Sequence, residues 1–423
     1  MRFLHAADIH LDSPLAGLPE YPGAPTGEIR DATREAFRNM VSLALEQAVD
    51  FVLIAGDLYD GDWKSYRTGL VFREQMLRLE EAGVPVFIVL GNHDAASVIT
   101  KKLSLPTKVH VFSARKAETQ QLAEIDVAIH GRSFGTRAVL DDLSVTYPPP
   151  IEGMFNIGLL HTSADGREGH DPYAPCSVPN LVAKGYDYWA LGHVHRRELL
   201  HNTPPILFPG NLQGRHIRET APEGKGCTIV EVDQGGRITM AHEPVDVVRW
   251  EHIECDVSSA DNEDGLYRCI EAALLSAFDR ADGRLLVTRI TLCGTTPLHG
   301  QLLGDPDQLL NETRSRGLDI SGGRIWIEKV VLQTQPVLDR ELLRQRQDTL
   351  GDVVRALELL ATEPAARAGI QADLKPLFAR LTPDVYEHAP ELADLRDGES
   401  LDDLLARASH LVLSALAAED GAR

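Results

Sequence analysis

Residues 51–57, with the sequence Phe-Val-Leu-Ile-Ala-Gly-Asp, constrain the fold more than any other stretch of this chain. The five apolar residues that open it predict a strand buried on both faces, as the strands of parallel sheets are. Gly56 permits a sharp turn, so Asp57 is expected at the carboxyl end of that strand. Open α/β sheets bind their ligands at this edge. A single Asp in such a place is more often a turn former, so its meaning depends on the other strand ends.

Four further predicted strands, at residues 2–7, 86–90, 155–160 and 186–191, are followed by Asp, Asn or His. The side chains in question are Asp8, His10, Asn92, His93, His161, His193 and His195. Carboxylate, amide and imidazole donors together suit Mn, Fe or Zn better than Mg or Ca, which prefer oxygen ligands. The set is too large for one ion. We therefore expect two divalent ions, which an Asp placed centrally among the donors can bridge, an arrangement that hydrolyses phosphate esters.

The order of elements predicts the fold class. Residues 29–49 and 66–81 carry apolar side chains at helical spacing between the first three strands, so this part reads β-α-β-α-β and predicts a parallel layer. Residues 206–208, 227–232 and 237–242 alternate like antiparallel strands and are expected to complete a second sheet. The predicted class is α/β, with a two-sheet α/β/β/α sandwich as its core.

Three parts are expected along the chain. Residues 1–245 form the sandwich, residues 246–335 form a smaller α/β capping domain, and residues 336–423 form a helical C-terminal region. The helical region has apolar residues at helical spacing at Leu342, Leu343, Leu350, Val353, Val354, Leu357 and Leu360, and again at Leu401, Leu404, Leu405, Ala408, Leu411, Val412 and Leu416. Packing of these helices on one another and docking of another protein's helices are equally good interpretations.

Charge and cysteine content bound the function. The chain has 42 Lys and Arg against 63 Asp and Glu, a formal net charge of −21. This balance argues against unaided binding to DNA or RNA, which depends on basic residues that displace counterions. It does not exclude nucleic acid as a substrate, because a partner subunit can supply a basic groove. Five widely spaced cysteines, with neither a signal peptide nor a membrane-spanning apolar run, predict a reduced cytoplasmic protein without membrane attachment.

Five motifs resemble, in order, those of the calcineurin-like metallophosphoesterases: Asp8-x-His10, Gly56-Asp57-x-x-Asp60, Gly91-Asn-His-Asp94, His161 and Gly192-His193-x-His195. The resemblance implies that one ion is held by Asp8, His10, Asp57 and His195. It implies that the other is held by Asp57, Asn92, His161 and His193. His93 would then act as general acid or stabilise the transition state, and Asp94 would orient it.

Two segments, residues 3–14 and 208–218, resemble the SbcD-type DNA-repair exonucleases and in particular their YhaO-like branch. The resemblance covers residues 1 to about 245 with specific motifs and extends more loosely to about 335. It implies a DNA exonuclease, with endonuclease activity as a further expectation, that uses Mn, or else Fe or Zn. It also implies an SMC-like coiled-coil ATPase partner, with DNA entering between the two proteins. Two copies of the chain are expected to pair through the helices at 29–49 or 66–78.

Several basic residues follow the last motif. Arg215, His216 and Arg218 are candidates for binding substrate phosphates near the ions, and ion pairing to Glu219 or Glu223 is an equal interpretation. Arg196 and Arg197 are expected to face solvent.

Two other function classes compete with a nuclease. A phosphodiesterase or phosphatase for small nucleotides would not need the capping domain or the long helical region. A non-catalytic scaffold subunit would not need the full set of expected metal ligands, all of which are present.

Overall fold

A computed structural model describes residues 1–13, 25–60, 66–95, 104–164, 173–221, 223–337, 340–378 and 380, with single positions at 401, 405, 408, 409 and 412. The chain divides into two compact units. The first consists of Met1–Ile253, Leu274–Arg289 and Arg314–Lys329. The second consists of Glu254–Ala273, Ile290–Thr313 and Val330–Arg423. The predicted boundaries at 245 and 335 remain a prediction.

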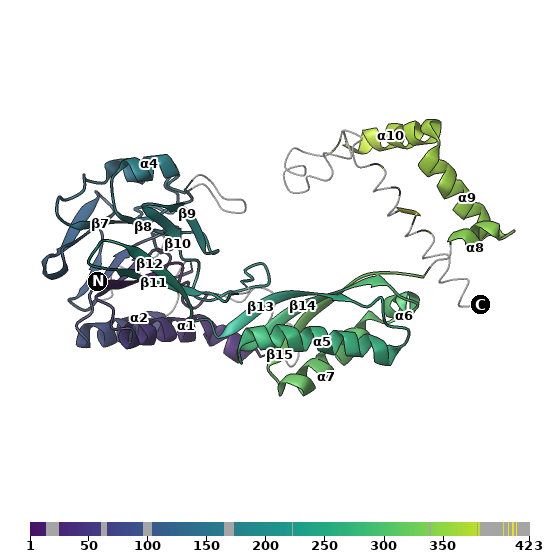
Figure 1. Cartoon of the computed structure of the whole chain (residues 1–423), viewed down its shortest axis with the longest axis horizontal. Coiled ribbons are helices and arrows are strands. Elements are labelled where there is room, and N and C mark those ends of the chain that lie inside the picture. Colours follow the sequence, from purple (N-terminus) through teal and green to yellow (C-terminus); the bar gives the residue numbers. More distant parts are fainter. Residues whose placement is uncertain are drawn as a thin grey trace. The chain divides into compact units, whose positions relative to one another are not determined.

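The first unit contains a six-stranded sheet in the order β12-β11-β1-β2-β3-β4. Strands β11 and β12 of this sheet are labelled in Figure 1. Its strands are β1 (Arg2–Ala6), β2 (Phe51–Ala55), β3 (Val86–Val89), β4 (Val109–Val111), β11 (Gly226–Val232) and β12 (Ile238–Pro244). The pairs β1–β2, β2–β3 and β3–β4 are parallel, whereas β11 pairs antiparallel with β1 and with β12. The parallel layer is therefore the one that the β-α-β-α-β pattern predicted.

A second six-stranded sheet has the order β5-β6-β7-β8-β10-β9. Its strands are β5 (Glu118–Leu122), β6 (Val127–Gly131), β7 (Phe155–His161), β8 (Tyr188–Gly192), β9 (Glu198–Asn202) and β10 (Pro205–Phe208). One part of the prediction is wrong here. Only residues 206–208 join this second sheet, whereas residues 227–232 and 237–242 extend the first one. Alternation identifies a strand with one exposed face, but it carries no information about which neighbour the strand pairs with.

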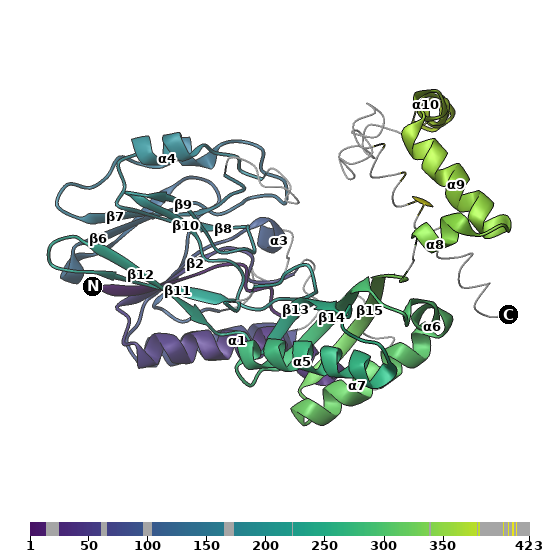
Figure 2. The ribbon, with the colours of Figure 1, turned by 45° about the vertical axis from the view of Figure 1, so that its right-hand side comes forward.

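The two sheets pack face to face with helices outside, which confirms the predicted α/β/β/α sandwich. Buried side chains between the sheets include Phe3, Phe51 and Phe87 from the first and Leu159 and Tyr188 from the second. Helices α1 (Thr26–Glu46) and α2 (Tyr66–Glu81) cover the outer face of the first sheet, and α4 (Val178–Ala183) lies over the outer face of the second (Figure 2). Because both faces of the central strands are covered, the apolar side chains of their continuous hydrophobic runs are buried on both sides of the sheet.

A three-stranded sheet follows, in the order β13-β14-β15. Its elements are β13 (Val248–Asp256), α5 (Glu263–Ala281), β14 (Leu285–Thr295), α6 (His299–Gly304), α7 (Pro306–Ser321) and β15 (Ile325–Gln335). This matches the βαβαβ pattern expected for residues 246–335, with one additional short helix.

The helical region begins with α8 (Arg340–Gln345), α9 (Thr349–Thr362) and α10 (Pro364–Phe378). Leu343, Leu350 and Val354 form a small buried cluster there, so α8 and α9 pack on each other, whereas Leu342 and Leu359 are exposed. Leu404, Leu411 and Leu416 of the second amphipathic stretch lie outside the described residues. None of the described helices has the length and apolar character needed to cross a membrane.

Candidate active site

Four of the predicted metal ligands lie on loops that follow strands and have an unusual backbone conformation. Asp8, His10 and Asp57 have φ values of 51°, 46° and 51°, and His193 has a φ of 107°. Such positive φ values are rare for residues other than glycine and mark positions held by their surroundings. The amide of Asp8 donates to Gly56 O at 3.0 Å, and the amide of His10 donates to Asp57 O at 3.0 Å. The ends of β1 and β2 are thus joined, and their polar side chains gather at one sheet edge.

One group of donors consists of Asp8, His10 and His195, whose ligand atoms lie within 4.8 Å of one another. The Nε2 atoms of His10 and His195 are 3.1 Å apart. The carboxylate of Asp8 accepts from the amide of His193 at 3.0 Å and 3.1 Å. Nδ1 of His10 is buried and has no hydrogen-bond partner among the described residues. Two imidazoles and a carboxylate this close together fit the ligand set of one divalent ion.

A second group consists of Asp57, His161 and His193, all buried, with ligand atoms within 4.8 Å of one another. Nδ1 of His161 donates to the carbonyl oxygen of Ala55 at 2.9 Å, so the neutral ring has a lone pair at Nε2. This Nε2 lies 3.0 Å from Asn92 Oδ1 and 3.5 Å from Asp57 Oδ2, which are also acceptors.

Three acceptors that face one another need a cation between them. The pKa of His161 is lowered by burial to about 3, so protonation of its ring does not supply that cation. A metal ion bound to Nε2, with the backbone carbonyl orienting the ring from the other side, satisfies all three atoms. The residues at this position therefore fit the ion that the sequence predicted.

The raised pKa values of the buried carboxylates also support bound cations at this site. Burial raises the pKa of Asp8 well above its ordinary value, and the charge of Asp57 raises it further. Burial also raises the pKa of Asp57, and it raises the pKa of Asp94 to about 7, with a contribution from Asp57. Carboxylates that share a buried site repel each other unless cations neutralise them. Two divalent ions would remove this cost.

His93 is more accessible than the predicted ligands, because 29% of its side chain is exposed whereas that of His161 is fully buried. Its amide donates to Asp57 Oδ1 at 3.0 Å, so the ring lies beside both donor groups. Nδ1 of His93 lies 3.1 Å from Asp60 Oδ1, and the hydrogen bond with Asp60 raises the pKa of His93.

The prediction that Asp94 orients His93 was wrong. The carboxylate of Asp94 accepts from the amides of Leu58, Tyr59 and Gly91 at 2.9–3.1 Å, so it holds the loops after β2 and β3. Asp94 lies in the short helix α3 (Asn92–Ala95), whose turn directs its carboxylate to these loops. Among the described residues, the acid that pairs with His93 is Asp60.

Arg215 lies between two carboxylates instead of standing free for substrate. Its guanidinium nitrogens are 3.2 Å from Asp60 Oδ2 and 2.9 Å from Glu219 Oε1. Glu219 Oε1 is also 2.8 Å from His195 Nδ1. His216 Nε2 lies 3.7 Å from the same oxygen, whereas Arg218 makes no ion pair with any acid of the described residues. Arg215 thus makes the expected ion pair with Glu219, whereas its binding of substrate phosphates stays a prediction.

Glu219 is the main residue of the site that the sequence did not predict as functional. Burial alone would raise its pKa, but the hydrogen bond and charge of His195 and the charge of Arg215 hold that pKa far below its usual value. The carboxylate therefore stays ionised and orients the imidazole of His195. A chain of contacts, His93–Asp60–Arg215–Glu219–His195, connects the accessible histidine to a predicted metal ligand.

Comparison with known proteins identifies the family of this chain. The model of calcineurin-like phosphoesterases matches residues 1–197, and that of the metallophosphoesterase YhaO middle domain matches residues 250–335. Over 301 aligned residues the chain is 36% identical to a Bacillus subtilis (strain 168) protein described as "Uncharacterized metallophosphoesterase YhaO". The aligned residues make up 70% of this chain and 72% of that protein. The chain belongs to the calcineurin-like metallophosphoesterases, in the YhaO branch. It is therefore a metal-dependent phosphoesterase, and the family together with the two donor groups supports a site for two divalent ions.

More distant relatives carry names that mention DNA. The "DNA double-strand break repair protein Mre11" of Methanopyrus kandleri is 27% identical over 263 residues, which cover 56% of this chain and 55% of that protein. The chain thus spans about half the length of this relative. Among solved structures, a dimetal phosphatase from Danio rerio aligns with a TM-score of 0.37 and 12% identity, over 58% of this chain and 96% of that one. A TM-score this low carries no inference.

Proposed function

We propose that this protein is a metal-dependent DNA nuclease that hydrolyses phosphodiester bonds, acts as an exonuclease with endonuclease activity in addition, and serves DNA repair. Mn is the proposed metal, with Fe or Zn as alternatives. The observation that carries the proposal is that three acceptor atoms, His161 Nε2, Asn92 Oδ1 and Asp57 Oδ2, face one another. A second group of potential metal ligands lies beside them. It supports a pair of ions at the edge where this family attacks phosphoesters.

Each donor has a proposed role. Asp8, His10, Asp57 and His195 would hold one ion, and Asp57, Asn92, His161 and His193 would hold the other. When bound, two such ions polarise the phosphoryl group and lower the pKa of an attacking water molecule.

His93 completes the proposed chemistry. Its Nδ1 side is held by Asp60, so the opposite ring nitrogen is left to donate a proton to the departing oxygen. The raised pKa of His93 keeps more of the ring protonated near neutral pH, as a general acid requires. Asp60 thereby takes the orienting role that we had expected of Asp94.

DNA as substrate rests on the relatives named as double-strand break repair proteins. Because the chain is acidic overall, we propose that an SMC-like coiled-coil ATPase partner supplies much of the basic surface for the duplex. His216 and Arg218 remain candidates for binding substrate phosphates, whereas Arg215 acts by positioning Glu219 and Asp60. Pairing of two copies and a cytoplasmic location belong to the same proposal.

The test compares three substrates with Mn present: end-labelled linear duplex DNA, a cyclic dinucleotide and a nitrophenyl phosphodiester. Preferential degradation of the duplex, lost in Asp57→Asn and His93→Ala variants that still fold, is the expected result. Hydrolysis of the cyclic dinucleotide without attack on DNA would favour the small-nucleotide phosphodiesterase. Purified protein that binds two equivalents of Mn but hydrolyses none of the three would overturn the proposed catalytic role.

A further inference from the structure

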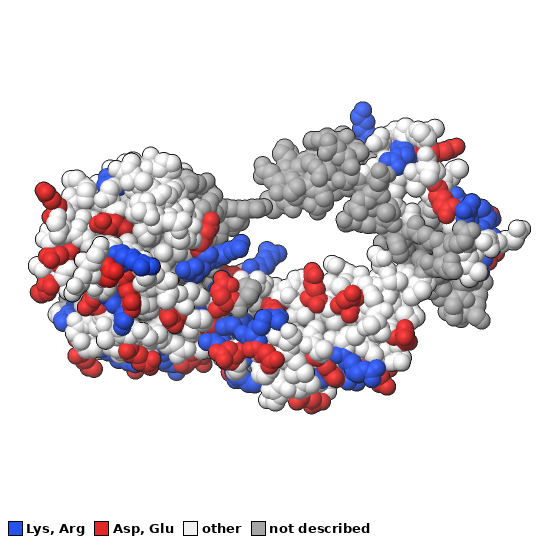
Figure 3. Space-filling view, in the orientation of Figure 1, with Lys and Arg blue, Asp and Glu red and all other residues white. Residues whose placement is uncertain are grey.

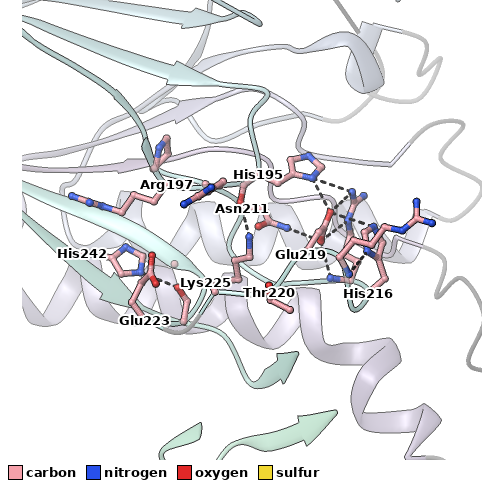
Figure 4. Close-up of a pocket in the computed structure, with 17 residues that line it drawn as sticks. His195, Arg197, Asn211, His216, Glu219, Thr220, Glu223, Lys225 and His242 are labelled. Carbon is pink, nitrogen blue, oxygen red and sulfur yellow. Dashed lines mark hydrogen bonds and ion pairs between the residues drawn. The ribbon is translucent and has the colours of Figure 1, made fainter. Parts of the chain in front are cut away.

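A pocket of about 880 Å³ lies against His195 on the first unit (Figure 4). We call it the basic pocket, because its lining includes Arg196, Arg197, Arg215, Arg218 and Lys225 but only two acids, Glu219 and Glu223. Its volume lies within the range of about 300–1,000 Å³ that is common for ligand pockets. Figure 3 shows Lys and Arg side chains interspersed with Asp and Glu on the first unit.

Two of the five cations already have partners. Arg215 pairs with Asp60 and Glu219, as described above. Nζ of Lys225 donates to the carbonyl oxygen of His195 at 2.6 Å. By contrast, Arg196, Arg197 and Arg218 form no ion pair with any carboxylate of the described residues, although the chain carries a net charge of −21. A concave surface with this excess of one charge concentrates ions of the opposite charge.

Two buried atoms of the lining also have no partner. Nε of Arg197 and Nδ1 of His242 are both buried, and neither has a hydrogen-bond partner within the part of the chain that the structure describes. The other ring nitrogen of His242, Nε2, donates to the carbonyl oxygen of Gly224 at 3.0 Å. Because the Nε atom of Arg197 has almost no exposed surface, a ligand in the pocket would meet the terminal nitrogens of this guanidinium group instead.

We propose that the basic pocket, which adjoins the metal site at His195, binds the phosphate groups of a ligand. Guanidinium groups match phosphate oxygens in both charge and geometry, and Arg196, Arg197 and Arg218 are available to do so. The lining, all of it described, contains no Phe, Tyr or Trp, so its dominant feature is the group of cationic side chains. Recognition therefore falls on phosphate, whether from a free nucleotide or polyphosphate or from a nucleic-acid strand.

The pocket shares a wall with the metal site. Lys225 contacts the backbone of His195, and Glu219 contacts its ring, so both residues belong to the lining and to the support of a predicted ligand. Phosphate bound in the pocket would lie next to Lys225 and Glu219, the two residues that contact His195. The proposal does not depend on which phosphoester the metal ions hydrolyse.

Isothermal titration calorimetry on the full-length, metal-free protein tests the proposal. The probes are pyrophosphate, ATP and a short single-stranded oligonucleotide, each without divalent ions. The variant Arg196→Gln/Arg197→Gln should bind roughly tenfold more weakly or worse, because two charge-assisted contacts are lost. The matched control, Arg115→Gln/Arg237→Gln, removes the same charge from exposed positions of the same unit outside the pocket and should bind like the wild type.

The three probes separate the sources of phosphate. Binding of pyrophosphate and ATP alone would identify a free nucleotide or polyphosphate as the ligand class, and binding of the oligonucleotide alone would identify a strand. The His93→Ala variant should bind each probe like the wild type, which distinguishes this pocket from the hydrolytic site. Absence of binding by the wild-type protein, or equal affinity in the Arg196→Gln/Arg197→Gln variant with an unchanged melting temperature, would overturn the proposal.

Discussion

The two donor groups at the sheet edge are built in different ways. In the group of Asp57, His161 and His193, the ring of His161 is oriented by the backbone carbonyl of Ala55, which is part of strand β2. In the group of Asp8, His10 and His195, the ring of His195 is oriented by the carboxylate of Glu219, which a loop supplies. The first group is thus preorganised by the sheet itself, whereas the second depends on a network of side chains. Substitutions can therefore affect the two proposed ions unequally.

The largest effect is expected where this difference should vanish, at Asp57, which is proposed to bridge both ions. Asp57→Asn should lower hydrolysis with Mn by roughly a thousandfold or more, since a metal ion contributes several kcal/mol to the transition state. Mass spectrometry and metal analysis of the purified variant should show fewer than two equivalents. Wild-type activity in a variant that binds two ions would contradict the bridging role.

The next largest effect is expected at His93, which lies outside both groups. His93→Ala should lower the rate by about 10²–10⁴-fold, as loss of a general acid does, while metal content stays unchanged. Asp60→Asn should show a smaller loss in the same direction, because Asp60 acts through His93. A rate for Asp94→Asn below that for Asp60→Asn, at equal thermal stability, would restore Asp94 as the orienting acid.

Glu219→Gln should separate the two groups directly. Loss of the charged partner of His195 should lower the affinity for the ion that His195 helps to hold by about 10–100-fold. A loss of this size is typical when a residue that orients a metal ligand is changed. The other ion, supported by the carbonyl of Ala55, should bind with unchanged affinity. Calorimetric titration with Mn should show one class of tight sites in the wild type and two classes of sites in the variant. Equal weakening of both ions would show that the two groups are not independent.

The smallest effect concerns the metal-free protein. Burial raises the pKa of Asp57 above its ordinary value of 3.8, so the ionised carboxylate destabilises the fold at neutral pH. Asp57→Asn should therefore stabilise the metal-free protein at neutral pH, which would raise its Tm. The gain should shrink as the pH falls toward 3.8, because protonation of the wild-type carboxyl removes the same charge. Calorimetric melts of both proteins in chelator at several pH values measure this, and a gain that grows on acidification would refute it.

The sequence predicted the sandwich, and it predicted that Asp and His side chains gather at one sheet edge, because both depend on local pattern. Continuous apolar runs such as 51–55 become strands buried on both faces, and the polar residues that follow them are carried to a common edge. The prediction was wrong where a partner had to be chosen. Residues 227–232 pair with β1 of the first sheet, and alternation alone could not specify that neighbour.

The same limit applies inside the site. Asp94 is adjacent to His93 in the sequence, yet the helical turn of α3 directs its carboxylate to backbone amides of other loops. Asp60, far away in the sequence, is the acid beside His93. The basic pocket is likewise invisible in the sequence, where Arg196 and Arg197 looked like ordinary solvent-facing cations.

The amino-acid sequence by itself determined which strands form and which donor atoms stand at their ends, because hydrophobic burial and strand geometry act over a few neighbouring residues. Only the tertiary structure decided which carboxylate orients which imidazole and which cations are left without partners. Contacts such as Glu219 with His195 and Asp60 with Arg215 join loops from different strands, and their geometry exists only once both sheets have packed.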